Sequence, residues 1–145
     1  MKVKELLATK SPEIFTIRPD QTVMAAMRIL AERHIGVVIV VDEDGTPLGI
    51  ISERDIVREG VRQGAALFDQ TAASIMTKNL IIAEPEDEIT YLSHTMTAKN
   101  IRHLPVMDEG NLIGIISIRD VVRVQVAHYS GEIHTLQYHL AEYMG

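Results

Sequence analysis

The sequence predicts an α/β (α+β) protein built from two copies of one small unit, each with the order strand, helix, strand, strand, helix. The main observation is an internal repeat. Residues 49–58, GIISERDIVR, return 65 positions later as residues 114–123, GIISIRDVVR, with eight of the ten positions identical. A repeat of so long a period indicates two copies of a supersecondary unit. The spacing of apolar residues around the repeat gives the order of the elements within each copy.

Each copy is expected to begin with a short strand followed by a helix. Residues 15–20 and 81–86 both have the pattern of a strand closed by proline, which does not sit within a central strand. The helix after each strand is predicted by apolar residues that form one buried face, which are Val23, Ala26, Met27 and Leu30 in the first copy and Ile89, Leu92 and Met96 in the second.

Two further strands and a helix complete each copy. Residues 37–41, VVIVV, form an unbroken apolar run and predict a strand buried on both faces, and residues 103–107 are their counterpart. Turns rich in Asp, Glu and Gly lead to the last strand, after which the repeated motif begins a helix. The remaining elements are expected at residues 42–45 and 108–111 (turns), 48–51 and 112–116 (strands), and 3–7 and 72–76 (short helices before each copy).

The length of 145 residues suits one compact domain of two repeats. Each copy would bury too little apolar surface to be stable alone, so we expect the copies to share a core. We expect the first repeat at residues 1–66, the second at 67–129 and an amphipathic C-terminal helix at 130–145. The apolar face of that helix needs a partner surface, and the valines before it point to more than one side, which indicates a subunit interface. These residues are Ile133, Leu136, Leu140 and Met144, preceded by Val121, Val122, Val124 and Val126.

The composition argues against several classes of function. A net charge of −6 and only six aromatic residues do not suit non-specific nucleic-acid binding, which needs basic and stacking surfaces. Without cysteine, the chain has no disulfide, thiolate metal ligand or cysteine nucleophile. No apolar stretch is long enough for a signal peptide or a membrane span, so we expect a cytoplasmic protein with no membrane partner. The histidines lack metal-ligand spacing, and we expect no metal site and no catalytic residues.

The repeated motif admits two interpretations. Ser52 and Asp55, like Ser117 and Asp120, have the spacing of a capping box and could serve only to cap a helix. The N–H groups at a helix start also favour an anion, and the glycine before each motif lets a ligand or another backbone approach closely. The serine and N–H groups suit a phosphate, the retained arginine suits phosphate oxygens, and the carboxylate suits a ribose diol. The motif therefore predicts either two helix caps or two nucleotide sites.

Four features together resemble tandem cystathionine β-synthase (CBS) domains, the Bateman module. They are the duplicated unit, the pattern Gly-apolar-x-Ser-x-x-Asp, residues 75–77 (IMT) and the strand at 102–106 (RHLPV), which together cover about residues 1–128. The resemblance implies two CBS repeats packed with pseudo-two-fold symmetry in a stand-alone, non-enzymatic regulatory protein. It implies an adenosyl ligand such as AMP, ADP, ATP, S-adenosylmethionine or NAD(H) in the cleft between the repeats, with no metal required. The implied partners are a second copy, in a homodimer, and a separate effector protein.

The resemblance also assigns residues to two sites. The first would use Ser52, Arg54 and Asp55, with Thr16 and Ile17 beside the base and Arg102 and His103 from the other repeat. The second would use Ser117, Arg119 and Asp120, with Thr77, Asn79, Leu80 and Ile82, opposite His34, Ile35, Gly36 and Val37. Because Gly36 and Val37 stand where Arg102 and His103 stand, we expect the second site to lack that pair of cations. The first site should then bind the more highly charged ligand.

Two other functions remain open. A ligand-free protein-interaction or dimerisation module would keep the same helix caps and would bind a partner through the terminal helix. An enzyme such as a nucleotide hydrolase would convert ATP to a product.

Overall fold

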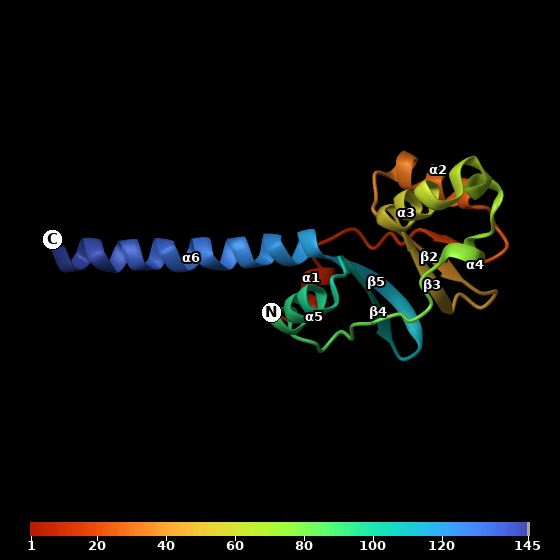
Figure 1. The fold of residues 1–145 in the computed structure, drawn as a ribbon. Helices are drawn as coiled ribbons and strands as arrows, with labels where there is room; N and C mark the ends of the chain where they lie inside the picture. Colours follow the sequence, from red (N-terminus) through yellow and green to blue (C-terminus); the bar gives the residue numbers. More distant parts are fainter. Residues whose placement is uncertain (145) are drawn as a thin grey trace.

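Two small sheets with flanking helices form the body of the molecule, and one long helix leaves it (Figure 1). The computed structural model describes residues 1–144. The first part of the chain contains α1 (Val3–Leu7), β1 (Thr16–Ile17), α2 (Val23–Arg33), β2 (Val37–Val41), β3 (Pro47–Ser52) and α3 (Glu53–Gln63). A 3-10 helix, η1 (Gly64–Asp69), then leads to α4 (Ala72–Ile75), α5 (Ile89–Lys99), β4 (His103–Asp108), β5 (Asn111–Ser117) and α6 (Ile118–Met144). This order confirms the mixed fold of two repeats followed by a C-terminal helix.

The first sheet has the strand order β1-β2-β3, with β2 parallel to β1 and antiparallel to β3. All five residues of β2 are buried, as its apolar run predicts. In the register of β2 and β3, Val37 lies opposite Ser52, so the start of the middle strand is next to the start of helix α3. This pairing places the polar motif at one end of the sheet.

The second sheet repeats this pairing but has only two strands, β4 and β5, with His103 opposite Ser117. The expected strand at residues 81–86 is therefore wrong, because only Ala83 pairs there, in a single parallel bridge to Val106. Pro105 explains the difference. In the first repeat the N–H of Ile39 donates to the Phe15 carbonyl, whereas Pro105, the counterpart of Ile39, has no N–H to donate.

The short helices α1 and α4 each pack against the repeat that they do not precede (Figure 1). Val3 and Leu6 of α1 join the core of the second repeat, and the N–H of Val3 donates to the Asp87 carbonyl at 2.9 Å. Ala72 of α4 joins the core of the first repeat, and its N–H donates to the Gln21 carbonyl at 2.7 Å. The expected single shared core is replaced by two cores, each completed by a segment from beyond its own repeat.

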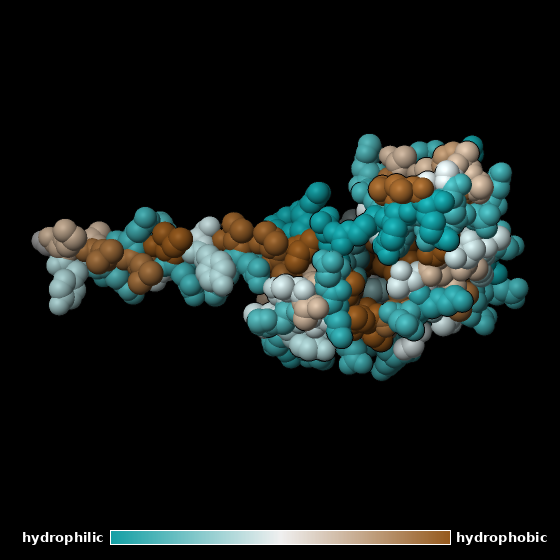
Figure 2. Space-filling model, in the orientation of Figure 1, coloured by the Kyte–Doolittle hydropathy of each residue, from teal (hydrophilic) through white to brown (hydrophobic). Residues whose placement is uncertain are grey.

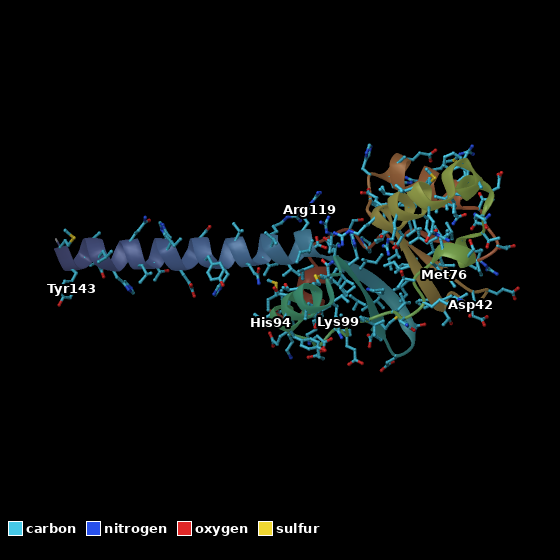
Figure 3. All side chains as sticks on the ribbon, viewed as in Figure 1. Asp42, Met76, His94, Lys99, Arg119 and Tyr143 are labelled. Atoms are coloured by element: carbon cyan, nitrogen blue, oxygen red, sulfur yellow. The ribbon has the colours of Figure 1, made fainter. Side chains whose placement is uncertain are left out.

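Two motif glycines make room for these crossing helices. A Cβ at Gly49 would lie 2.6 Å from the Met76 sulfur and 2.9 Å from the Thr77 carbonyl oxygen, and one at Gly114 would lie 2.7 Å from Cδ2 of Leu7. Figure 3 shows Met76 beside β3. The close approach predicted at these glycines is therefore made by protein segments, and the glycines hold α1 and α4 in place.

Helix α6 runs without interruption over 27 residues, from the second motif to Met144. The separate terminal helix expected at residues 130–145 is thus the continuation of the last helix of the second repeat, and Gly145 lies outside the described residues. Its first turns pack against α5, and the rest projects away from the body (Figure 1). Within residues 1–144, no helix combines the length and the apolar character needed to cross a membrane.

Candidate functional site

Both repeated motifs form the predicted capping boxes. The Ser52 hydroxyl accepts the N–H of Asp55 at 3.1 Å, and Oδ2 of Asp55 accepts the N–H of Ser52 at 2.9 Å. Ser117 and Asp120 make the same two bonds at the same distances. The motif residues therefore have a structural role at the start of α3 and α6, and any ligand would meet carboxylates that are already oriented.

The start of each helix keeps one N–H group available. The N–H of Glu53 donates to the Gly36 carbonyl at 3.0 Å, and that of Ile118 donates to the Arg102 carbonyl at 2.7 Å. Among residues 1–144, the backbone N–H groups of Arg54 and Arg119 have no protein acceptor. Since a helix N-terminus carries a partial positive charge, these groups can bind an anion.

A cavity of about 500 Å³, here called the first cavity, lies in front of the Ser52–Asp55 motif. Its volume lies within the range of small-molecule sites, about 300–1,000 Å³. Both repeats contribute to it, as its main lining residues show: Gly36, Val37, Ile50, Ser52, Arg54, Asp55, Arg58, Thr77, Lys99, Arg102 and His103. The cavity could therefore hold a ligand that contacts both repeats at once.

The charges around the first cavity oppose the net charge of the chain. Four cationic side chains line it against two carboxylates, although the whole chain carries −6. The cations are Arg54, Arg58, Lys99 and Arg102, and the carboxylates are Glu53 and Asp55. Figure 3 shows Lys99 on the second repeat, so the positive lining comes from both halves. A local excess of cations favours an anionic ligand even in an acidic protein.

A second cavity, of about 450 Å³, lies in front of the Ser117–Asp120 motif. The segment between α1 and β1 closes one side of it, and Lys10 of that segment donates to Oδ2 of Asp120 at 2.7 Å. Three cationic side chains and three carboxylates line this cavity, which are Lys10, Arg102 and Arg119 and Glu13, Glu53 and Asp120. Its lining is therefore neutral overall, unlike that of the first cavity.

Asp120 is the one buried charged residue in the described chain, with 9% of its surface exposed. Burial alone would raise the pKa of Asp120, but the hydrogen bonds from Lys10 and Ser117 outweigh burial and leave this pKa below its ordinary value. Among residues 1–144, Asp55 has no ammonium partner of this kind. Its Oδ1 accepts from the guanidinium of Arg58 at 2.9 Å, and that arginine side chain is 66% exposed.

The two cavities share a wall made by the starts of β2 and β4. Gly36, Val37, Arg102 and His103 line both of them. The expectation that the second site lacks Arg102 and His103 is therefore wrong, because the imidazole of His103 lies against Gly36, within 3.2 Å of where a Cβ would be. Both motifs meet the same pair of strand ends.

His103 does not act as a cation at neutral pH. Burial lowers the pKa of His103 to about 4; Lys10 and Arg102 lower it further, while Asp120 opposes the shift. The difference in charge between the cavities therefore arises from Arg58 and Lys99 in the first cavity, because the charges of Lys10 and Glu13 cancel in the second. It does not arise from Arg102 and His103, which line both cavities.

The structure regroups several residues that the resemblance assigned to the two sites. Thr77 lines the first cavity and not the second, because it pairs with Ile50 of β3 through two backbone hydrogen bonds. Thr16 and Ile17 line neither cavity; Ile17 is 2% exposed and belongs to the core of the first repeat. Three residues that were assigned to the second site also line neither cavity, namely Asn79, Leu80 and Ile82.

Sequence reasoning missed three cationic residues of the cavities, namely Lys10, Arg58 and Lys99. A signal existed for Arg58, since the repeated decapeptide conserves it as Arg123 in the other copy. Lys10 could be placed only once α1 was known to cross to the second repeat. Within residues 1–144, no cluster of three or more His, Cys, Asp or Glu side chains has the arrangement of a metal site.

Comparison with known proteins agrees with this architecture. The family model described as the CBS domain matches residues 3–62 and 72–127. The chain belongs to the CBS domain family. A similar relative is the protein MK0525 of Methanopyrus kandleri, 35% identical over 114 residues, which cover 78% of the chain. The match spans 58% of that relative's own length.

Solved structures of CBS proteins share the fold. The CBS-domain protein ATU1752 from Agrobacterium tumefaciens is 40% identical with a TM-score of 0.83, over 86% of this chain and 92% of that one. The CBS domain pair of MJ0100, in complex with 5-methylthioadenosine and S-adenosyl-L-methionine, is 28% identical with a TM-score of 0.77, over 88% and 98%. PAE2072 from Pyrobaculum aerophilum, in complex with AMP, is 31% identical with a TM-score of 0.73, over 83% and 89%.

Proposed function

We propose that this CBS pair is a regulatory module that binds an adenosine phosphate in the first cavity. The observation that carries the proposal is the composition of that cavity: a free helix N–H, an oriented carboxylate and an excess of cations drawn from both repeats. A phosphorylated nucleoside needs these groups together, with donors for the phosphate and an acceptor for the ribose hydroxyls.

Each group has a distinct role in the proposed complex. Oδ2 of Asp55 stays in the capping box, while Oδ1 exchanges the exposed Arg58 for a ribose hydroxyl. The N–H of Arg54 and the guanidinium of Arg102 bind phosphate oxygens from the two sides of the cavity. A ligand held in this way contacts the first repeat through its ribose and phosphate, and the second repeat through its phosphate.

Relatives with adenosyl ligands support the ligand class. The complexes of MJ0100 and PAE2072 contain a methylthioadenosine, an S-adenosylmethionine or an AMP. These ligands have the adenosyl group in common and differ in charge at the 5′ position. The four cations of the first cavity favour the phosphorylated members, AMP, ADP or ATP, over S-adenosylmethionine, which carries a positive charge at its sulfur.

We assign the second cavity a weaker or different ligand. Lys10 already neutralises Asp120, and cations and carboxylates balance around this cavity. The inequality between the two sites that the sequence suggested is therefore retained in the proposal, on different residues. Ser117, Arg119 and Asp120 remain its candidate contacts, with Gly36, Val37 and Arg102 from the shared wall.

The output is regulatory and not catalytic in this proposal. Both motif serine hydroxyls accept the N–H of the capping aspartate, and within residues 1–144 neither forms a hydrogen bond with a histidine, so neither is held as an activated nucleophile. A ligand that joins the two repeats shifts the population toward one relative arrangement, which a second copy or a separate cytoplasmic effector protein can recognise.

A panel of ligands in a thermal unfolding experiment tests the proposal. A compound that binds only the folded chain raises its melting temperature, by an amount that increases with concentration. We expect AMP, ADP or ATP to raise it more than adenosine or S-adenosylmethionine, without release of phosphate on incubation. An unchanged melting temperature with every adenosyl compound contradicts the proposal, and turnover of ATP contradicts its non-catalytic part.

A further inference from the structure

An unpartnered apolar stripe runs along helix α6, beyond the body of the protein (Figures 1 and 2). Its members are spaced alternately by four and three residues, so they follow one side of the helix in a heptad pattern. Each is between 47% and 95% exposed. The stripe, here called the α6 seam, consists of Val122, Val126, Tyr129, Ile133, Leu136, Leu140 and Tyr143.

We propose that the α6 seam pairs with the seam of a second copy of this chain in an antiparallel, two-stranded coiled coil. This inference does not depend on the proposed ligand. The heptad pattern is the first argument, because a strict alternation of four and three over three heptads is the pattern that packs against a like helix. No charged residue interrupts the seam.

The size of the seam is the second argument. The stretch from Val122 to Tyr143 is about 33 Å long at about 1.5 Å per residue. In the register described below, six of these side chains, from Val126 to Tyr143, face the partner; at roughly 100 Å² each they give an interface on the order of 600 Å² per helix. Specific, stable complexes bury roughly 600–1,000 Å² per partner, so the seam alone reaches the lower end of the area that a dimer needs.

The polar side chains that flank the seam favour the antiparallel arrangement. With Ile133 opposite the partner's Leu136, Val126 meets the partner's Tyr143, and all these seam layers are apolar. Glu132, which flanks the seam, then lies beside the partner's His139, and the two-fold symmetry of the dimer repeats this contact. An antiparallel register shifted by one heptad toward the body places Glu132 against the partner's Glu132, which is unfavourable.

A parallel pair lacks this complementarity. In register, Glu132 would face the partner's Gln137, and His139 would face no acidic group. A parallel pair would also bring two bodies to the same end of the coiled coil, although each chain carries a net charge of −6. The antiparallel pair places the bodies at opposite ends. Oε1 of Glu132 already lies 3.0 Å from Nε2 of His128 within the helix, so its carboxylate would lie between two imidazoles.

Sedimentation equilibrium of two matched variants tests the interface. Leu136 in the seam and Tyr138 on the outer face are 61% and 60% exposed, so substitution of either leaves the two cores intact. Leu136→Asp should weaken association roughly a hundredfold or more, because it buries a carboxylate in an apolar layer, and halve the mass at a fixed concentration. Tyr138→Asp should sediment like the wild type. A monomeric wild-type chain, or equal masses for both variants, overturns the proposal.

Disulfide cross-linking tests the orientation, because the chain has no cysteine of its own. Chains carrying Val126→Cys and chains carrying Tyr143→Cys, mixed and oxidised, should form a covalent dimer that contains one of each. Val126→Cys alone should not cross-link, since an antiparallel pair separates the two copies of this position. Efficient cross-linking of Val126→Cys alone indicates a parallel pair and overturns the antiparallel assignment.

Discussion

The ammonium group of Lys10 lies 2.7 Å from Oδ2 of Asp120 and 2.7 Å from the carbonyl oxygen of Ile115. The Asp55 carboxylate in the other repeat has instead an exposed arginine, Arg58, as its partner. Two nearly identical motifs thus present their aspartates differently, one neutralised by a lysine from a crossing segment and one open to a displaceable side chain. The duplication explains why the two motifs have the same backbone structure, and the residues packed around each motif make the two sites different.

Lys10→Met should destabilise the protein at neutral pH. The substitution leaves the buried Asp120 carboxylate without its cation, which costs about 1–3 kcal/mol of unfolding free energy. The pKa of Asp120 should rise, because burial raises it and the hydrogen bond from Lys10 is the largest contribution that opposes burial. The difference in unfolding free energy between the wild type and Lys10→Met should become smaller as the pH falls toward 4, because Asp120 of the variant takes up a proton more readily.

Urea unfolding at pH 7 and pH 4 measures this effect. Lys4→Met is the matched control, because Lys4 and its partner Glu86 are an exposed ion pair, and its removal should cost much less. A Lys10→Met variant as stable as Lys4→Met at pH 7 contradicts the structural role assigned to Lys10.

Arg102→Ala should weaken the binding of ADP or ATP more than that of adenosine. Its guanidinium lines the first cavity and is assigned to phosphate oxygens, and a charge-assisted hydrogen bond contributes about 1.5–3 kcal/mol, which is about tenfold or more in affinity. Calorimetry with the two ligands measures the difference. Arg28→Ala, an exposed arginine of α2 that lines neither cavity, should leave both affinities unchanged. Equal losses for both ligands in Arg102→Ala would exclude the phosphate assignment.

The buried imidazole of His103 should make folding stability depend on pH. The pKa of this group is about 4 in the folded chain and near 6.5 in the unfolded chain, so the unfolded chain binds more protons between these values. Stability is then fully present above pH 6.5 and falls as the pH drops toward 4, by at most about 1.4 kcal/mol per pH unit from this group.

The variant His103→Gln isolates this contribution. Subtracting its unfolding free energy from that of the wild type at each pH removes the titration of the other groups. The unfolding free energy of the wild type minus that of the variant should decrease as the pH falls from 6.5 to 4. A difference that is constant across this range contradicts the assignment of a buried, neutral imidazole.

Gly49→Ala should destabilise the crossing of α4 onto β3. The new Cβ would lie 2.6 Å from the Met76 sulfur and 2.9 Å from a backbone oxygen, so α4 must shift, at a cost of about 1–3 kcal/mol. Gly131→Ala is the control, because nothing lies within 4 Å of its Cβ and it stands in an exposed helix, where alanine gains up to about 1 kcal/mol. Chemical denaturation that ranks the two variants in the opposite order would contradict the role given to Gly49.

Periodicity and the internal repeat predicted most elements of the fold correctly, because each depends on a local pattern. The order of strands and helices, the buried strand β2 and both capping boxes follow from residues near in sequence. The loss of the strand near Ala83 had a signal in Pro105, but only the pairing register shows which N–H is missing. The two helices expected near the C-terminus are one, since Ser130 and Gly131 interrupt the pattern without ending the helix.

The path of the chain between the repeats could not be predicted from local patterns. α1 and α4 are too short for their apolar residues to reveal which core they enter, and their exchange moves Thr77 into the first cavity and Lys10 into the second. The lowered pKa of His103 likewise depends on burial against Gly36, which is distant in sequence. The motif residues Ser52, Arg54 and Asp55, with Arg102 and His103 from the other repeat, were predicted and line the first cavity, whereas the places of Lys10, Thr77 and Lys99 required the structure.

Calorimetric titration of AMP into two matched variants tests the central claim most directly. Asn at position 55 or 120 keeps an acceptor for the capping box but removes the carboxylate charge, so each substitution preserves the helix start. We expect Asp55→Asn to abolish or weaken AMP binding by at least about tenfold, as one lost charge-assisted hydrogen bond predicts, while Asp120→Asn binds AMP like the wild type. Wild-type affinity in Asp55→Asn, or a greater loss in Asp120→Asn, would contradict the assignment of the adenosine phosphate to the first cavity.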